Sequence, residues 1–225
     1  MATWFKSKLR LWQKQRQLKK LKDSRFAFLF DEPLKQGVDD KLDTYICFDC
    51  ETTGLNPKKD KIITLSAIKI QGNQILASQA LNLWIEQACS ISPESIAVHQ
   101  IRNTDLQEYS DESMEERRAI EQFLHFIQGY PLVGYYLEFD VAMVNQVIKP
   151  WLGITLPNRQ IEVSELYYEL RLKTLRHSME QLTINLKFDA ILTRLNIPNL
   201  GQHDAFSDAL MTALIFLKLQ EHAKR

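Results

Sequence analysis

The chain has 225 residues, of which 45% are hydrophobic and 25% charged, a composition typical of soluble globular proteins rather than of disordered or membrane-embedded ones. No apolar run approaches the roughly 20 residues that a transmembrane helix requires. The three cysteines, Cys47, Cys50 and Cys89, do not have the spacing of metal ligands. We therefore expect a reduced, cytoplasmic protein.

The charges are unevenly distributed. Although 28 lysines and arginines balance 28 acidic residues overall, residues 1–22 contain eight basic residues and no acidic one. The rest of the chain therefore has 20 basic against 28 acidic residues, a net charge of −8. Phe5, Leu9 and Trp12 recur at helical spacing, which predicts a basic amphipathic helix.

This basic helix has several candidate contacts. It is suited to pack on the body of the protein, to bind a nucleic-acid backbone or an anionic membrane surface, or to occupy a groove of a polymerase or other protein partner. Turn-forming residues over 31–40 indicate a linker. We expect residues 1–40 to form an extension with this linker, and residues 41–225 to form the main domain.

Short apolar runs and helical patterns follow one another along the main domain. Strands are expected over residues 44–49, 61–70, 74–85 and 132–135. Helices are expected to begin near Ser92 and to span residues 112–127, 140–147, 164–176, 181–195 and 204–222. Gln71-Gly72-Asn73 predicts a hairpin turn, and Pro150 is expected to lie beyond the end of its helix. This order indicates an α/β fold with a mixed sheet flanked by helices.

Two carboxylates follow the first predicted strand. Asp49 and Glu51 are two residues apart on an extended backbone, so their side chains point to the same face. Side by side they repel each other unless a cation lies between them, and oxygen ligands of this kind suit hard divalent metals. An ordinary acidic loop after a strand is the alternative interpretation.

Three further groups stand near predicted helix starts. Asp140 opens a helix after a short strand, a position where the helix dipole favours a carboxylate. Asp208 lies one turn into the last helix on an apolar face, and a buried charge there needs a partner. His203 precedes that helix and would lie over the same place. Taken singly, Asp140 and His203 are more typical of helix caps or surface residues.

Together these residues resemble a known family. The motifs are Asp49-x-Glu51-Thr52-Thr53-Gly54, Val133-Gly134-x-x-x-x-Phe139-Asp140 and His203-x-Ala205-x-x-Asp208-Ala209. In this order they resemble the DEDD superfamily of 3′→5′ exonucleases, and His203 indicates its histidine branch, which includes the epsilon subunit of bacterial DNA polymerase III and ribonuclease T. The stretch from Pro93 to Ile101 is similar to a further family segment. The resemblance covers residues 43–222 and implies a ribonuclease H-like fold with a mixed five-stranded sheet.

The resemblance also implies roles for individual residues. Asp49, Glu51, Asp140 and Asp208 would hold two Mg²⁺ ions, for which Mn²⁺ can substitute, and His203 would accept the proton of the attacking water. Thr52 and Thr53 would belong to the loop that holds the terminal nucleotide, and Leu55 would pack against the terminal bases. Glu94 and His99 match substrate-contacting positions, with a helix-capping glutamate and a helix-end histidine as the structural alternative.

The chain departs from the family pattern at two places. Tyr135-Tyr136 stands where many relatives have His-Asn, and Glu162-Val163 stands where relatives often have Asp-Thr. All five catalytic positions are present, so we expect an active enzyme that degrades single-stranded nucleic acid, with DNA favoured, from the 3′ end to nucleoside 5′-monophosphates. Proofreading or repair is the expected context. An RNA-trimming or oligonucleotide-degrading exoribonuclease, or a catalytically silent nucleic-acid-binding module, is the alternative.

Overall fold

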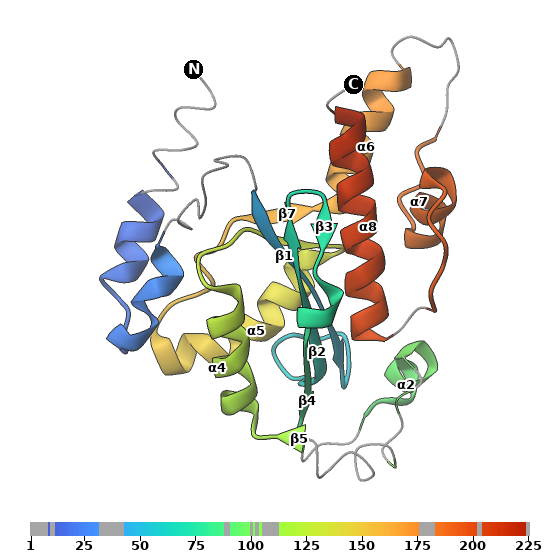
Figure 1. Ribbon diagram of the computed structural model, residues 1–225. Coiled ribbons are helices and arrows are strands. Elements are labelled where there is room, and N and C mark those ends of the chain that lie inside the picture. The colour runs from blue at the N-terminus through green and yellow to red at the C-terminus, as the bar shows by residue number, and fades with distance from the viewer. Residues whose placement is uncertain are drawn as a thin grey trace.

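The computed structural model describes residues 9, 12–31, 43–87, 91–99, 101, 104, 113–175, 183–201 and 204–223. A mixed sheet of seven strands lies at its centre, in the order β5-β4-β2-β1-β6-β7, with β3 paired to β2 (Figure 1). The strands are β1 (Thr44–Thr52), β2 (Ile62–Gln71), β3 (Gln74–Ile75), β4 (Leu81–Ile85), β5 (Ser113–Met114), β6 (Leu132–Gly134) and β7 (Gln160–Glu162). The expected mixed sheet is confirmed. The two-residue strands β3 and β5 bring the number of strands from the expected five to seven.

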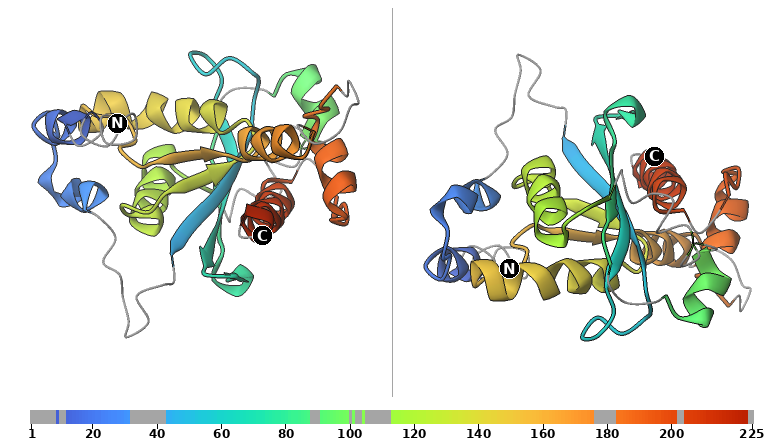
Figure 2. Two further views of the ribbon diagram at one scale, coloured as in Figure 1. Left: turned by 90° about the horizontal axis from the view of Figure 1, so that it is seen from above. Right: turned by 90° about the horizontal axis from the view of Figure 1, so that it is seen from below.

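Helices cover both faces of this sheet. They are α2 (Pro93–His99), α4 (Glu116–Ile127), α5 (Leu137–Leu152), α6 (Val163–Leu175), α7 (Phe188–Leu195) and α8 (Ala205–Ala223), with 3₁₀ helices η1 (Ser24–Phe30) and η2 (Ala77–Gln79). The views from above and below place α4 and α5 on one face and α8 on the other, with α6 and α7 beside α8 (Figure 2). None of the helices in the described part of the chain is long and apolar enough to cross a membrane.

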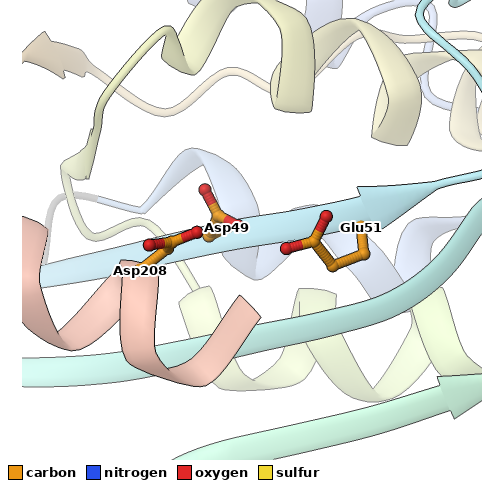
Figure 3. A group of neighbouring side chains, drawn as sticks. All are labelled: Asp49, Glu51 and Asp208. Carbon is orange, nitrogen blue, oxygen red and sulfur yellow. The ribbon is translucent and has the colours of Figure 1, made fainter. Parts of the chain in front are cut away.

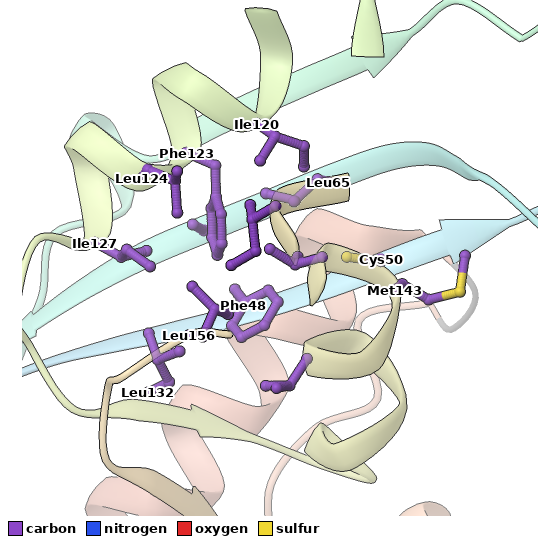
Figure 4. Close-up of a cluster of buried hydrophobic side chains, with 14 of the residues drawn as sticks. Phe48, Cys50, Leu65, Ile120, Phe123, Leu124, Ile127, Leu132, Met143 and Leu156 are labelled. Atoms are coloured by element: carbon purple, nitrogen blue, oxygen red, sulfur yellow. The ribbon is translucent and has the colours of Figure 1, made fainter. Parts of the chain in front are cut away.

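β1 is the central strand that connects these layers. It pairs antiparallel with β2 along its whole length but parallel with β6 only at Ile46 and Cys47. Alternate residues point to opposite faces of a strand. Phe48 accordingly packs beneath α4, where its ring lies 4.9 Å from that of Phe123 (Figure 4). Cys47 belongs to a second apolar cluster on the α8 face.

The described part of the N-terminal segment packs against this core. Residues 12–18 are helical, and Phe26 and Leu29 of η1 are completely buried in the cluster beneath α4 and α5. The Lys22 backbone N–H donates to the carbonyl of Leu152 at 3.0 Å, which ties the segment to the C-terminal end of α5. η1 was missed in the sequence because a seven-residue 3₁₀ helix has too few turns to show a periodic pattern. The division of the chain at residue 40 stays a prediction, since residues 32–42 lie outside the described residues.

Some element boundaries differ from those expected. The predicted strand 74–85 is interrupted by η2, because β2 changes partner there from β3 to β4 and the exposed Ser78 and Gln79 leave the sheet. Residues 113 and 114 pair with β4, so α4 begins only at Glu116, where the Glu115 carboxylate accepts hydrogen bonds from the first backbone N–H groups. The strand β7 was not predicted, since three residues are too few to show an alternation of apolar and polar side chains.

Two helix predictions had wrong bounds. The helix expected over residues 140–147 already begins at Leu137. α5 continues through Pro150 to Leu152 and ends at Gly153, whose positive φ of 75° suits glycine. A proline in the last turn disrupts less than one in the middle of a helix, because few carbonyls follow that need its missing N–H. α7 begins at Phe188 rather than at residue 181, since the backbone of Lys187 is extended.

Candidate active site

The site begins with the two faces of β1. Because Phe48 and Cys50 point into the core, Asp49 and Glu51 point to the opposite face, toward α8. Asp208 in the first turn of α8 completes the group from that side (Figure 3). Asp49, Glu51 and Asp208 each offer a carboxylate oxygen within 4.8 Å of the others. Two segments almost 160 residues apart in the chain thus place three acidic groups together.

The start of α8 is fixed by another carboxylate, Asp204. Its side chain accepts hydrogen bonds from the backbone N–H of Ser207 at 3.1 Å and from the Ser207 hydroxyl at 2.8 Å. This is an N-cap, which satisfies a backbone donor that the first helical turn leaves free. Asp204 therefore sets where the helix begins and so where Asp208 stands.

Asp140 reaches the site from α5. β6 pairs with β1 only as far as Cys47, so the next N–H groups along that edge of β1 need other partners. The buried Asp140 carboxylate accepts the hydrogen bond of the Cys50 N–H at 3.1 Å. Asp140 lies outside the three-carboxylate group but lines the same cavity of about 1200 Å³.

The first turn of α5 is held by Glu162. Its carboxylate accepts from the Leu137 N–H at 3.0 Å, and its other oxygen accepts from the Ser164 N–H at 3.0 Å and the Ser164 hydroxyl at 2.7 Å. One side chain therefore caps the helix that carries Asp140 and fixes it to the start of α6. Glu162 stands where relatives often have an aspartate, and its role as a cap was not predicted from the sequence.

Burial and mutual repulsion make this cavity unfavourable for negative charge. Burial, followed by the charges of Asp208 and Asp204, raises the pKa of Glu51 to about 8. Burial also raises the pKa of Asp49 well above its usual range, and the charges of Asp140 and Glu51 add to the effect. The pKa of Asp140 is raised by burial as well, although its hydrogen bond from Cys50 opposes the shift.

The lining of the cavity fits divalent cations. Seven carboxylates face it and no lysine or arginine does so among the described residues; the acidic residues are Asp49, Glu51, Glu138, Asp140, Glu162, Glu165 and Asp208. Such a cavity repels a phosphate unless cations neutralise it. Clustered carboxylate oxygens are the ligands that Mg²⁺, Mn²⁺ and Ca²⁺ prefer. The donor set therefore matches the divalent metal that the sequence predicted, and the acidic cluster is compatible with its binding.

The other predicted residues have different outcomes. The Thr52 hydroxyl donates to the carbonyl of Gly54 at 2.8 Å, and the Thr53 hydroxyl accepts from the Lys61 N–H at 3.0 Å, so both threonines shape the loop after β1. Leu55 at the tip of this loop is 81% exposed and lines the cavity. The assignments of Thr52, Thr53 and Leu55 to substrate binding stay predictions.

Three predicted residues cannot be placed. His203 lies outside the described residues, and only the backbone of Glu94 and His99 is described, in α2. Their predicted roles are therefore untested. Sequence reasoning assigned no role to Phe188 on the cavity wall or to four acidic residues, which are Glu138, Glu162, Glu165 and Asp204. Only Asp204 had a usable signal, the Asp-x-x-Ser spacing of a helix N-cap.

A mixed sheet whose central strand β1 and neighbouring helix α8 bring three carboxylates together defines the class of protein as a nuclease-type α/β fold, with an acidic cluster compatible with metal binding. The family model RNase_T, described as exonuclease, matches residues 46–216. The chain belongs to this family. The predicted enzyme class, a 3′→5′ exonuclease of the DEDD superfamily, is thereby confirmed at the level of the family.

Relatives with known names agree with this assignment. The chain is 30% identical over 186 residues to the DNA polymerase III PolC-type of Thermotoga maritima, which covers 81% of this chain and 12% of that protein. It is 25% identical over 184 residues to the DNA polymerase III subunit epsilon of Aquifex aeolicus, with 81% of this chain and 84% of that protein covered. The chain thus spans about an eighth of the PolC-type relatives.

Solved structures share the fold at low sequence identity. A zinc-bound E. coli exonuclease I in complex with single-stranded DNA has a TM-score of 0.66 and 14% identity, covering 82% of this chain and 42% of that one. Cell-death related nuclease 4 has a TM-score of 0.64 and 14% identity, covering 80% and 64%. These similarities establish the ribonuclease H-like fold.

Proposed function

We propose that this protein hydrolyses single-stranded nucleic acid, with DNA favoured, from the 3′ end and releases nucleoside 5′-monophosphates. The observation that carries the proposal is the carboxylate group of Asp49, Glu51 and Asp208, which lies in a cavity lined by four further acidic residues. A cavity of this charge is suited to phosphodiester chemistry only when cations are bound. The DNA polymerase III names of the relatives and the single-stranded DNA bound by exonuclease I support the choice of substrate.

The carboxylates have defined parts in this proposal. Asp49, Glu51 and Asp208, with Asp140 beside them, would hold two divalent ions, which we propose to be Mg²⁺ with Mn²⁺ as a substitute. When bound, these ions supply Lewis-acid stabilisation of the charge that develops on the phosphate and the leaving oxygen. The Cys50 N–H holds Asp140 in position, and Asp204 and Glu162 hold the two helix starts.

The remaining steps belong to the chain's own polar groups. We assign His203 as the group that takes the proton from the attacking water, since a neutral imidazole has a suitable pKa near 6.5. The loop of Thr52, Thr53 and Leu55 would receive the terminal nucleotide, and Glu94 and His99 would contact the strand. The water oxygen would bond to the phosphorus as the bond from phosphorus to the 3′-oxygen of the preceding nucleotide breaks. That 3′-oxygen takes up a proton from solvent, and the phosphate departs on the released 5′-mononucleotide.

Product analysis on labelled strands tests this function. Matched DNA and RNA strands of several lengths are incubated with Mg²⁺, with Mn²⁺ or with a chelator. We expect stepwise shortening from the 3′ end only in the presence of metal, with DNA degraded faster than RNA. The Asp49→Asn variant should lose at least about a hundredfold in rate. Asp43→Asn, an exposed carboxylate at the other end of β1, is the matched control and should keep full activity.

Each alternative predicts a different result. Preferred degradation of RNA would replace the DNA assignment with an exoribonuclease. Binding of strands without any metal-dependent release by the wild type would contradict hydrolysis and indicate a silent binding module.

We also propose that the basic N-terminal segment contacts nucleic acid or a protein partner. The exposed Arg16, Lys19 and Lys20 are the described cations suited to this role. Deleting residues 1–40 is a poor test, because it removes Phe26 and Leu29 from the core. Replacing the three cations with glutamine leaves the core intact. The slope of binding affinity against salt should fall by up to about 2 on single strands, at about 0.7 per lost phosphate contact. An unchanged slope would leave a protein partner as the remaining role.

A further inference from the structure

Tyr136 has an unusual backbone conformation at the edge of the catalytic cavity. It is the N-cap residue of α5, with φ 53° and ψ 34°, the left-handed region. A bulky residue is rare in this region because its side chain is strained there, and such residues cluster at functional sites. Its side chain makes no capping hydrogen bond to the helix. The Tyr136 side chain therefore does not cap the start of α5.

Other residues impose this conformation. Glu162 takes the capping role by accepting from the Leu137 N–H, and β6 pairs with β7 through Gly134 and Glu162. Gly134 leaves no room for a side chain, because a Cβ atom there would lie 2.7 Å from the Leu137 side chain. The chain bends at Tyr135 and Tyr136 between β6 and α5. The position of the Tyr136 backbone is fixed independently of its ring.

The ring itself is exposed and supported from behind. It is 67% exposed while it lines the carboxylate cavity. The ring of Tyr135 lies 4.5 Å away, and the ring of Phe188 lies 4.8 Å beyond that of Tyr135. The Tyr135 hydroxyl donates to the carbonyl of Leu186 at 2.9 Å, which holds the second ring in place. A supported aromatic surface thus faces the mouth of an otherwise acidic cavity.

We propose that Tyr136 is a base-stacking residue, whose ring packs against one nucleobase of the bound single strand. This inference rests on the proposed function. Among the described residues no lysine or arginine lines the cavity beside Tyr136, so its exposed ring is suited to contact a base of the strand rather than a phosphate. Stacking on an aromatic side chain contributes about 1–3 kcal/mol per base and accepts any base, because every base has a π-face. Tyr136 would thus position the strand without selecting its sequence.

Two variants separate the ring from the backbone. Tyr136→Phe keeps the ring, whereas Tyr136→Asn removes it and places a residue that tolerates the left-handed conformation. Binding is measured on strands whose 3′-terminal linkage is a phosphorothioate that resists hydrolysis. We expect Tyr136→Asn to weaken binding about 5- to 150-fold and Tyr136→Phe to change it less than about twofold. Tyr168→Asn is the control, since Tyr168 is an exposed tyrosine of α6 that does not line the cavity.

Abasic strands identify the contact. A single abasic site is moved along the strand from the 3′ end. At one position the abasic site should weaken binding by the wild type by the same factor as the Tyr136→Asn substitution does. The same abasic site should not weaken binding by Tyr136→Asn any further. The proposal would be overturned if Tyr136→Asn bound intact strands as tightly as the wild type does. It would also be overturned if Tyr136→Asn bound more weakly than the wild type at every position of the abasic site. If the wild type shows this pattern but hydrolyses no strand, stacking stands and the proposed hydrolysis fails.

Discussion

On one face of β1, Ile46, Phe48 and Cys50 are buried in the apolar cluster beneath α4 and α5. On the other face of the same strand, Asp49 and Glu51 gather with Asp208 in a cavity that disfavours their charge. The first face stabilises the fold, and the second weakens it in the absence of cations. The acidic face is tolerated because the packed face holds the strand rigidly. The same comparison explains why a carboxylate group of this kind lies on a central strand rather than on a loop.

The largest expected effect is on the packed face. Phe48 is 1% exposed, so Phe48→Ala leaves a cavity beside Phe123 and should lower the free energy of unfolding by about 3–5 kcal/mol. Urea unfolding measures the change. Leu55→Ala is the control, because a side chain that is 81% exposed should contribute less than about 0.5 kcal/mol. A loss below 1 kcal/mol for Phe48→Ala would show that the core does not support β1 as described.

The acidic face predicts how stability depends on pH. The folded protein raises the pKa of Glu51 from 4.5 to about 8, so without metal it keeps a proton that the unfolded chain releases. The protonated Glu51 therefore contributes stability that is fully present below about pH 4.5, its pKa in the unfolded chain. That contribution is lost as the pH rises to about 8, its pKa in the folded protein. The melting temperature of the metal-free protein should therefore fall over this range because of Glu51. Glu51→Gln should make the curve flatter, and an unchanged curve in that variant would contradict the assignment.

Removing one charge from the cluster should stabilise the metal-free protein. Asp49→Asn relieves repulsion with Asp140 and Glu51, and we expect its melting temperature in a chelator to rise by about 2–4 °C, which corresponds to about 1 kcal/mol. The rise in melting temperature that Mg²⁺ gives the wild type should be smaller in this variant. Asp43→Asn should change neither value. A lower melting temperature for Asp49→Asn in the chelator would indicate that this carboxylate is held by favourable contacts instead.

A smaller effect is expected where α5 holds the loop after β1. The Gln146 side-chain amide donates to the carbonyls of Pro57 at 2.8 Å and Asp60 at 3.1 Å. Gln146→Leu should loosen the loop that carries Leu55 and raise KM about fivefold, with kcat nearly unchanged. Asn145 lies on the same helix and its side-chain oxygen accepts the hydrogen bond of the Leu156 N–H. Asn145→Leu removes this acceptor and should lower stability without changing KM. Equal KM values in both variants would argue against a role for this loop in substrate binding.

Local patterns in the sequence predicted which carboxylates lie close together, while their roles stay predictions. The alternation along β1 put Asp49 and Glu51 on one face, and the family motifs pointed to Asp140 and Asp208. The contacts that hold these residues were not predictable in the same way. The bond from the Cys50 N–H to Asp140 depends on where β6 stops pairing, and the cap by Glu162 depends on a three-residue strand. Such contacts arise from tertiary structure and leave no periodic signal.

The element boundaries show the same limit. α5 was expected to stop before Pro150, yet packing and a glycine cap carry it one turn further. Phe26 and Leu29 were not recognised as core residues, because their burial depends on α4 and α5 rather than on a pattern within η1. The role of His203 stays a prediction.

Binding of Mn²⁺ tests most directly whether the carboxylate group on β1 is a cation site. Titration calorimetry with Mn²⁺ is performed on the wild type, on Asp49→Asn and on Asp43→Asn. We expect the wild type and Asp43→Asn to bind the ion alike, and Asp49→Asn to bind it at least about tenfold more weakly. Equal affinity in all three proteins would contradict the central claim.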